Sequence, residues 1–198
     1  IGVSLRSESV ARQLTPQACL YSVMSEDAAG ARVRVIGALR SVLVASQERE
    51  AVVSAIADPA IHIVTLTITE KGYTLDADGV ALNRDDPAVR ADLADPHNPQ
   101  TAVGVLALGL QRRAAAGGAP LTILSCDNLS ENSQRLGALL RDYLAATYPG
   151  VLPWLESAVT FPSSMVDRIV PAMTTGQKAL QSQALGCIDE GAISTEPF

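Results

Sequence analysis

The sequence is poor in the features that mark several classes of protein. Aromatic residues make up only 4% of its 198 residues, and the three cysteines, Cys19, Cys126 and Cys187, are far apart. Widely spaced cysteines of odd number form neither a disulfide framework nor a zinc-ligand cluster, so we expect a reducing, cytoplasmic compartment. No run approaches the roughly 18 consecutive apolar residues of a membrane helix, and no signal peptide is recognised. We therefore expect no membrane partner and no bound metal.

Positive charge is also scarce. Fifteen Lys and Arg residues stand against 21 Asp and Glu residues, which gives a formal net charge of −6. An acidic chain without a basic run argues against nucleic acid as a partner. Hydrophobic residues make up 47% of the chain, which is enough for a packed core and excludes a disordered protein.

Short β-branched runs alternate with longer segments rich in Ala and Leu, which is typical of an α/β fold with a parallel sheet and flanking helices. The predicted strands are residues 1–5, 19–24, 32–36, 61–67, 121–125 and 158–161, with 19–24 at a sheet edge. The predicted helices are residues 9–14, 47–57, 87–93, 101–116, 131–147 and 177–185, with a further short helix at Trp154. Residues 61–67 are almost continuously apolar, which predicts a central strand covered on both faces. Residues 70–100 are predicted to form an acidic, loop-rich excursion.

Polar segments follow several predicted strands, at the place where open parallel sheets bind ligands. One segment holds Thr67, Thr69 and Glu70; a second is residues 125–128, Ser-Cys-Asp-Asn; a third, residues 161–171, contains Asp167. Each also has an ordinary structural interpretation. The first is compatible with a polar turn, the second with a helix cap formed by Asp127 or Asn128, and the third with a surface ion pair.

Several catalytic signatures are missing from the sequence. It contains neither GxGxxG nor GxxxxGK[ST], so no phosphate-binding loop is visible, and its two histidines offer no convincing base for a catalytic triad. The residues by themselves leave open a nucleotide-dependent oxidoreductase, a non-catalytic nucleotide- or sugar-binding module, and a metal-independent hydrolase or isomerase that uses Glu70 or Asp167.

At these same segments the sequence resembles the polyol-specific long-chain dehydrogenases, also called the mannitol dehydrogenase family. The matching pieces run in family order along the whole chain: residues 2–6 (GVSLR), 34–37 (RVIG), 65–73 (TLTITEKGY), 111–113 (QRR), 125–129 (SCDNL), 161–171 (FPSSMVDRIVP) and 196–198 (EPF). Residues 2–7 and 70–73 are more similar to the fructuronate reductase branch than to the mannitol branch.

This resemblance implies a Rossmann-like parallel sheet that is incomplete at the N-terminus. It also implies NAD-dependent hydride transfer between a sugar polyol or aldonate and the matching ketose, of the D-mannonate/D-fructuronate or mannitol/fructose type. In the family an amide at the position of Asn128 lies next to the reacting oxygen, and the aspartate at the position of Asp167 lies near the nicotinamide. Thr67, Thr69 and Glu70 would line the same crevice. The family is independent of zinc and often monomeric, so a monomer is compatible with the resemblance.

The turn after the first strand corresponds to the part of the family that distinguishes NAD from NADP. A carboxylate there accepts a hydrogen bond from the ribose 2′-hydroxyl and repels a 2′-phosphate. Glu8 is present, but Ser9 replaces an acid that is usual in the family. With Arg6 and Arg12 nearby, NADP is an alternative cofactor.

Two family elements are absent from these residues: the glycine-rich phosphate loop and the Lys-x4-Asn-x2-His motif that supplies the general base. By resemblance, residues 1–198 correspond to most of a cofactor domain without its first βα unit and without the helical catalytic domain. We therefore expect the isolated chain to have no turnover. A non-catalytic binding module remains the alternative.

Overall fold

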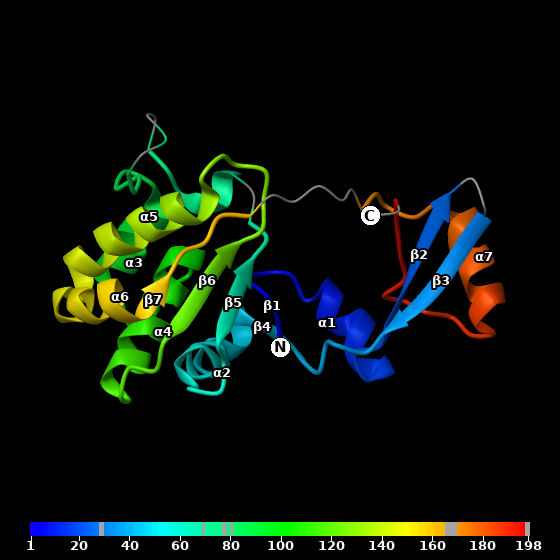
Figure 1. The fold of residues 1–198 in the computed structure, drawn as a ribbon, viewed down its shortest axis with the longest axis horizontal. Helices are drawn as coiled ribbons and strands as arrows, with labels where there is room; N and C mark the ends of the chain where they lie inside the picture. Colours follow the sequence, from blue (N-terminus) through cyan, green and yellow to red (C-terminus); the bar gives the residue numbers. More distant parts are fainter. Residues whose placement is uncertain (28–29, 69, 77–78, 80, 165–169, 197–198) are drawn as a thin grey trace. The chain divides into compact units, whose positions relative to one another are not determined.

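The computed structural model describes residues 1–27, 30–68, 70–76, 79, 81–164 and 170–196. The chain forms two compact units (Figure 1). Unit 1 combines Ile1–Ala45 with Asp167–Phe198, and unit 2 is Ser46–Val166. No helix in the described part of the chain is both long and apolar enough to cross a membrane.

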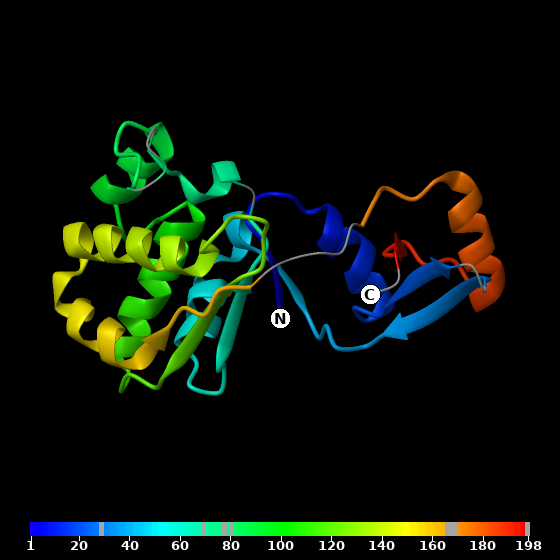
Figure 2. The ribbon, with the colours of Figure 1, turned by 45° about the horizontal axis from the view of Figure 1, so that its top comes forward.

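Unit 2 is built on a parallel sheet of three strands. The strands β5 (Ile63–Leu66), β6 (Leu121–Ser125) and β7 (Val159–Thr160) lie in the order β5-β6-β7. The helix α4 (Ala102–Ala115) connects the first pair and α5 (Asn132–Thr147) precedes β7. Figure 2 shows these two helices beside the sheet. The predicted α/β architecture of parallel strands with flanking helices is confirmed.

The long helices of unit 2 form where the sequence predicts them, because their apolar residues recur at helical spacing. The predicted apolar face of α5 is buried, namely Leu136, Leu139, Leu140, Tyr143 and Leu144. The side chain of Thr101 caps α4 by accepting a hydrogen bond from the Gly104 N–H at 3.0 Å. The remaining helical segments of the unit are α2 (Ala45–Ala57), η2 (Glu70–Tyr73), α3 (Pro87–Ala94), η3 (Pro149–Val151) and α6 (Leu152–Ala158).

The prediction that residues 61–67 form a central strand covered on both faces is wrong for the described chain. Within the described sheet β5 pairs only with β6, and Ile63 is 59% exposed while Leu66 is buried. Its apolar residues are therefore buried on one face only. A continuous apolar run indicates that a strand can be buried on both faces. It does not show that the described part of the chain buries both faces.

Two charged side chains are built into the core of unit 2. Arg113 is 1% exposed and donates five hydrogen bonds to backbone carbonyl oxygens. Asp92, in the acidic segment, is 1% exposed and accepts hydrogen bonds from the backbone of Gln100 and from both the N–H and hydroxyl of Thr101. Buried charges need such partners, so both residues tie loops to the helices that they join.

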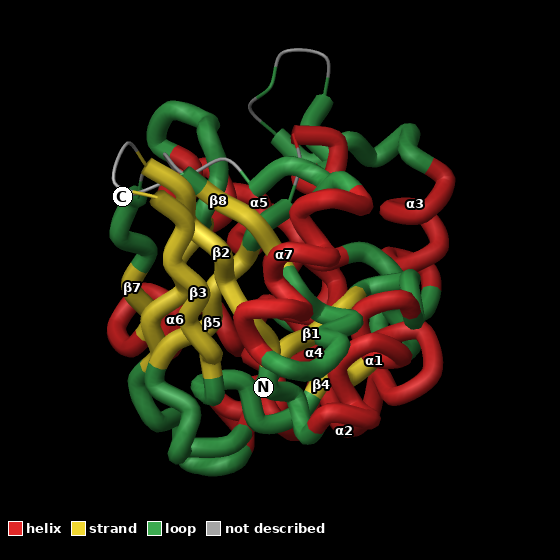
Figure 3. The backbone as a smooth tube through the Cα atoms, turned by 90° about the vertical axis from the view of Figure 1, so that its right-hand side faces the viewer, coloured by secondary structure: helices red, strands yellow, loops and turns green. Residues whose placement is uncertain are grey.

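Unit 1 contains two small sheets. The strands β1 (Gly2–Ser4) and β4 (Val42–Val44) are parallel, and the second sheet has the order β3-β2-β8. Its strands are β2 (Tyr21–Asp27), β3 (Gly30–Ile36) and β8 (Ile193–Thr195). The helical segments are α1 (Ser9–Leu14), η1 (Thr15–Gln17) and α7 (Thr175–Leu185). Figure 3 shows α7 next to the β3-β2-β8 sheet.

The prediction of an edge strand at residues 19–24 is wrong, because β2 is the middle strand of its sheet. It is antiparallel to β3 and parallel to β8. The partner β8 is only three residues long, and such a short run carries no periodic signal in the sequence.

A polar network holds the two segments of unit 1 together. The carboxylate of Asp189 accepts hydrogen bonds from Gln17 Nε2 at 2.5 Å and from the backbone N–H and hydroxyl of Ser22. Gln181 Nε2 in turn donates to the Ser22 hydroxyl at 2.6 Å. Burial by itself raises the pKa of Asp189, but these hydrogen bonds outweigh it and the pKa lies below its ordinary value. The C-terminal segment is therefore fixed to β2 by an ionised carboxylate.

Candidate functional site

The carboxyl ends of β5 and β6 lie side by side in unit 2. The strands are in register with Leu66 opposite Ser125, and the Cys126 N–H extends the ladder by donating to the Leu66 carbonyl at 2.7 Å. Thr67 directly follows β5, and the segment 125–128 leads away from the end of β6. The register thus brings together two of the three polar segments that the sequence indicates.

Asp127 is the centre of the hydrogen bonds at this edge. Its Oδ2 accepts the phenolic proton of Tyr73, and it also accepts a hydrogen bond from the Ser125 hydroxyl at 2.8 Å. Its Oδ1 accepts from the Leu129 N–H at 3.0 Å. Tyr73 comes from η2 and is fully buried, and its hydroxyl also contacts that of Ser125. The segment after β5 is therefore joined to the turn after β6.

A second set of contacts joins the segment after β7 to the same turn. Asn132 donates from Nδ2 to the carbonyl oxygens of Asp127 at 3.1 Å and Ser164 at 2.9 Å. The Ser164 hydroxyl donates to the Ser125 carbonyl at 2.6 Å. The hydroxyl of Ser133, which is buried, accepts the Ser125 N–H at 2.7 Å. The ends of all three described strands of this sheet are thus held by one network.

The protonation states of this network follow from its burial and hydrogen bonds. Burial, and then the hydrogen bond to Asp127, raises the pKa of Tyr73 well above its usual value of 10.0. Burial alone raises the pKa of Asp127, but hydrogen bonds from Tyr73, Leu129 and Ser125 outweigh it and hold that pKa below 3.8. Tyr73 is therefore a proton donor and Asp127 an ionised acceptor at neutral pH.

The helix-cap interpretation of this turn is wrong. The residue at the N-cap position of α5 is Glu131, and neither Asp127 nor Asn128 caps the helix. Glu131 has a φ of 55° and a ψ of 33°, the left-handed conformation. For a residue other than glycine this costs about 1–3 kcal/mol, and such strain is concentrated at functional sites.

The predicted residues of this edge differ in how they are placed. Asn128 and Thr67 are both exposed, and neither side chain hydrogen-bonds to the described residues. Their polar groups are therefore accessible from solvent. Thr69, Asp167 and the side chain of Glu70 lie outside the described residues, so their predicted roles stay predictions.

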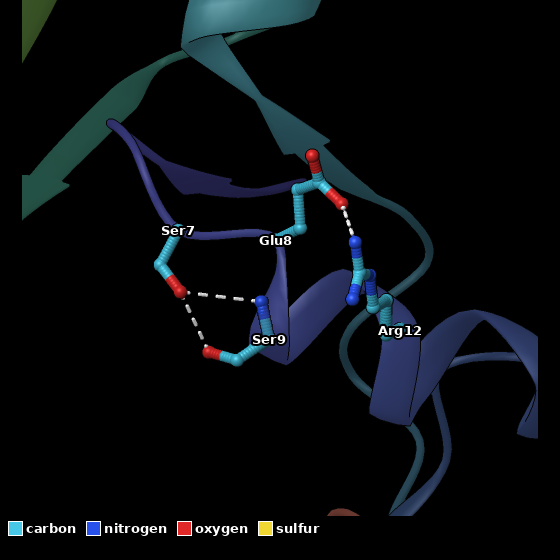
Figure 4. Close-up of polar contacts among 4 residues, drawn as sticks. All are labelled: Ser7, Glu8, Ser9 and Arg12. Carbon is cyan, nitrogen blue, oxygen red and sulfur yellow. Dashed lines mark hydrogen bonds and ion pairs between the residues drawn. The ribbon is translucent and has the colours of Figure 1, made fainter.

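The remaining predicted residues, Glu8 and Ser9, belong to unit 1. They follow β1 and begin α1, and Figure 4 shows their contacts. Arg12 Nη2 lies 2.5 Å from Glu8 Oε2, an ion pair one turn apart on the helix. The Ser9 hydroxyl is 2.8 Å from that of Ser7, whose Oγ also accepts the Ser9 N–H at 3.2 Å. A partly exposed carboxylate is thus paired with a cation at this turn.

Comparison with known proteins identifies the family. The family described as "Mannitol dehydrogenase Rossmann domain" matches residues 1–198, the whole chain. The chain belongs to the mannitol dehydrogenase family. The resemblance seen in the sequence motifs is confirmed.

Individual members of the mannitol dehydrogenase family are similar to this chain over its whole length. The polyol:NADP oxidoreductase of Gluconobacter oxydans is 38% identical over 203 residues, which cover 100% of this chain and 42% of that protein. The mannitol 2-dehydrogenase of Neosartorya fischeri is 35% identical over 201 residues, which cover 100% of this chain and 40% of that protein. The chain therefore spans about two-fifths of the length of the curated relatives that it matches.

Solved structures show the same fold. A D-sorbitol dehydrogenase in substrate-free form has a TM-score of 0.92 and 38% identity, with 100% of this chain and 42% of that chain covered. A ternary complex of Pseudomonas fluorescens mannitol 2-dehydrogenase with NAD and D-mannitol has a TM-score of 0.91 and 35% identity, with 100% and 41% covered. The fold of this member of the mannitol dehydrogenase family is a Rossmann domain.

Sequence reasoning missed several side chains of the network in this mannitol dehydrogenase family domain. Asn132 and Ser133 read as ordinary polar residues in the sequence, and Ser164 belongs to the candidate segment 161–171 without being singled out there. Tyr73 was part of a candidate segment, but its contact with Asp127 spans 54 positions. A lone aromatic residue after a core strand, in a chain with 4% aromatics, is the one signal that points to it.

Proposed function

We propose that this chain is the cofactor-binding part of an NAD(P)-dependent oxidoreductase that interconverts a sugar polyol or aldonate and the corresponding ketose. The observation that carries the proposal is the exposed amide of Asn128, which follows β6 and stands between Asp127 and Leu129, two residues joined by a hydrogen bond from the Leu129 N–H to Asp127 Oδ1. The names of the relatives support it, since they include a polyol:NADP oxidoreductase and mannitol 2-dehydrogenases.

The chemistry of an amide suits this reaction. Reduction of a ketone builds negative charge on its oxygen, and a neutral N–H donor stabilises that charge as it develops. Removal of one such donor typically raises the barrier by about 2.7–4 kcal/mol. In this proposal Asn128 is the catalytic residue that donates to the reacting oxygen. The nicotinamide cofactor, when bound, supplies or accepts the hydride.

We keep the predicted cofactor-binding residues of each unit as separate proposals, each argued from the contacts within its own unit. In unit 2 the exposed Thr67 hydroxyl, at the carboxyl end of β5, would bind the cofactor next to Asn128. In unit 1 the Glu8 carboxylate would accept a hydrogen bond from the ribose 2′-hydroxyl, and Ser9 would contact the same end. We retain Thr69, Glu70 and Asp167 as proposed cofactor-binding residues on the resemblance alone.

The cofactor preference depends on the ion pair at α1. A free carboxylate repels a 2′-phosphate, but Arg12 partly neutralises Glu8 and offers a guanidinium for the phosphate. We therefore propose that NAD is the main cofactor and that NADP is also accepted. The relative named for NADP and the solved complex with NAD are consistent with either outcome.

Two substrate classes follow from different observations. The motifs at residues 2–7 and 70–73 favour a hexuronate or aldonate such as D-fructuronate or D-mannonate. The names of the relatives favour a neutral polyol such as mannitol or sorbitol. The 198 residues contain no Lys-x4-Asn-x2-His motif, so we propose that the isolated chain binds ligands without turning them over.

A cofactor-coupled screen tests the proposal. The full-length protein that contains this chain is assayed with fructuronate, tagaturonate and fructose in the reducing direction, and with mannitol and sorbitol in the oxidising direction. We expect turnover in one class, and a loss of about 10²–10³-fold in kcat for Asn128→Ala. The matched control is Asn98→Ala, which changes an exposed asparagine of the same unit. Full activity of Asn128→Ala would refute the role of the amide, and absence of any nicotinamide-dependent turnover would refute the proposed function.

A further inference from the structure

The peptide segment that carries Asn128 is fixed from both sides by one carboxylate. Asp127 directly precedes Asn128, and its Oδ1 accepts the N–H of Leu129, which directly follows it. The opposite oxygen, Oδ2, accepts the hydroxyl protons of Tyr73 and Ser125. The backbone of Asn128 is therefore held between two anchored neighbours, while its own side chain is exposed.

Tyr73 is the anchor that comes from outside this turn. It belongs to η2, which follows β5, whereas Ser125 and Leu129 belong to the same short segment as Asp127. The ring of Tyr73 is fully buried, so its position is set by the packing of unit 2. The hydrogen bond from the Tyr73 hydroxyl to Asp127 Oδ2 therefore fixes the Asp127 carboxylate, and with it the turn.

The direction of this hydrogen bond does not change with pH in the neutral range. An ionised carboxylate only accepts protons, and the phenol of Tyr73 keeps its proton because its pKa is raised by burial. A hydrogen bond from a neutral donor to a charged acceptor is about twice as strong as one between neutral groups. The contact is thus suited to holding a geometry during turnover.

We propose that Tyr73 is a positioning residue, which acts through Asp127 to hold the Asn128 amide where it meets the reacting oxygen of the substrate. This rests on the proposed function, in which Asn128 is the donor. A misplacement of about 1 Å at a catalytic group can cost about 10²-fold in rate. Loss of the Tyr73 hydroxyl loosens the turn without removing the amide, so we expect a loss of about 10–100-fold in kcat, smaller than that of Asn128→Ala.

The test uses Tyr73→Phe in the full-length protein, because phenylalanine keeps the ring and removes only the hydroxyl. The matched control is Tyr143→Phe: Tyr143 is 1% exposed, and its hydroxyl donates to the Asp92 carbonyl at 3.1 Å, so that substitution also removes a buried phenolic hydrogen bond. We expect Tyr73→Phe to lower kcat with little change in the KM for the cofactor. We expect Tyr143→Phe to lower stability without this change in kcat.

A double-mutant cycle separates positioning from an independent effect. If Tyr73 acts through Asn128, Tyr73→Phe costs less than about threefold in kcat when Asn128→Ala is already present. The same fold loss in both backgrounds, or a wild-type kcat for the single variant, would overturn the proposal.

Failure of the proposed function gives a different pattern, because the parent protein would then show no nicotinamide-dependent turnover, and failure of the proposed role of the amide would leave Asn128→Ala fully active. Should Tyr73→Phe fail to fold, Ser125→Ala removes the other hydroxyl donor to the same oxygen and is put through the same cycle. We expect its loss in kcat to vanish in the Asn128→Ala background, and an undiminished loss would count against the mechanism.

Discussion

Replacement of Arg113 by methionine is the most direct test of how unit 2 is held together. The guanidinium donates to five carbonyl oxygens at 2.7–2.9 Å, and these belong to Ile56, Asp58, Ile61, Ala119 and Pro120. The end of α2, the connection to β5 and the connection to β6 all meet at this one side chain. Methionine fills much of the same volume but removes the Arg113 donor from all five acceptors, of which the Asp58 carbonyl keeps the Ile61 N–H at 3.0 Å.

The expected cost follows from the burial of these groups. Arg113 is a buried donor to five neutral carbonyl oxygens, so the cost of its removal comes from the acceptors that lose this donor. Each orphaned buried acceptor alone would cost about 1–3 kcal/mol, but these costs overlap because the connections can rehydrate. We therefore expect Arg113→Met to lower the free energy of unfolding by about 4 kcal/mol. With a urea m-value of about 2 kcal/mol/M, the midpoint falls by about 2 M.

The assay has a built-in reporter in the single tryptophan of the chain, Trp154. Its indole N–H donates to the Gly118 carbonyl at 2.7 Å, so its fluorescence reports on unit 2. The matched control is Arg112→Met, because Arg112 is the adjacent arginine and forms an exposed ion pair with Glu50. We expect the urea midpoint of Arg112→Met to move by less than about 0.5 M. Equal shifts for the two variants, or a shift below about 0.5 M for Arg113→Met, would refute the reasoning.

Three further outcomes are expected. Gly118→Ala lowers the urea midpoint, because Gly118 has a φ of 67° and a new Cβ would lie 2.5 Å from Trp154 Nε1. The control Gly150→Ala leaves the midpoint unchanged, because Gly150 has open space around it. Asp127 has a lowered pKa in the folded chain, so its contribution to stability is complete above the unfolded pKa of about 3.9 and is lost as the pH falls through the folded value. Urea unfolding from about pH 5 to pH 2 should therefore show a shallower acid loss for Asp127→Asn than for the parent chain. Glu8→Gln should raise the ratio of kcat/KM for NADP to that for NAD in the full-length protein, and an unchanged ratio would contradict the role of Glu8.

Long periodic segments are the part of this fold that the sequence predicts well. The apolar face of α5 and the cap at Thr101 are local patterns, and both are found as expected. The strands β4 and β8 were missed because each has three residues and takes its conformation from a distant partner. The wrong prediction that β2 is an edge strand has the same cause, because its second neighbour in the sheet is β8.

In the candidate site, too, the residues that follow from a local pattern are predicted and those that depend on distant contacts are not. The rule that ligands bind beyond parallel strand ends is enough to select the segments that contain Thr67 and Asn128, because strand ends can be read from the sequence. The family resemblance is what singles out Asn128 within residues 125–128. The contact of Tyr73 with Asp127 depends on how η2 packs against β6, and no local pattern encodes a distance between those elements. Sequence alone therefore selects exposed polar groups at the strand ends, and it misses the buried side chains that fix the turn around them.

The order of the units along the chain has a consequence for synthesis. Unit 2 is continuous, whereas unit 1 is assembled from both ends of the chain, and Ser22 meets Asp189 across 167 positions. At about 5–20 residues per second, the ribosome needs about 10–30 s to make the intervening stretch. During that interval the β2–β3 hairpin has no β8 to pair with, whereas the residues of unit 2 are all made before β8 is synthesised. The incomplete unit 1 of the growing chain is thus the part that has most need of protection by chaperones.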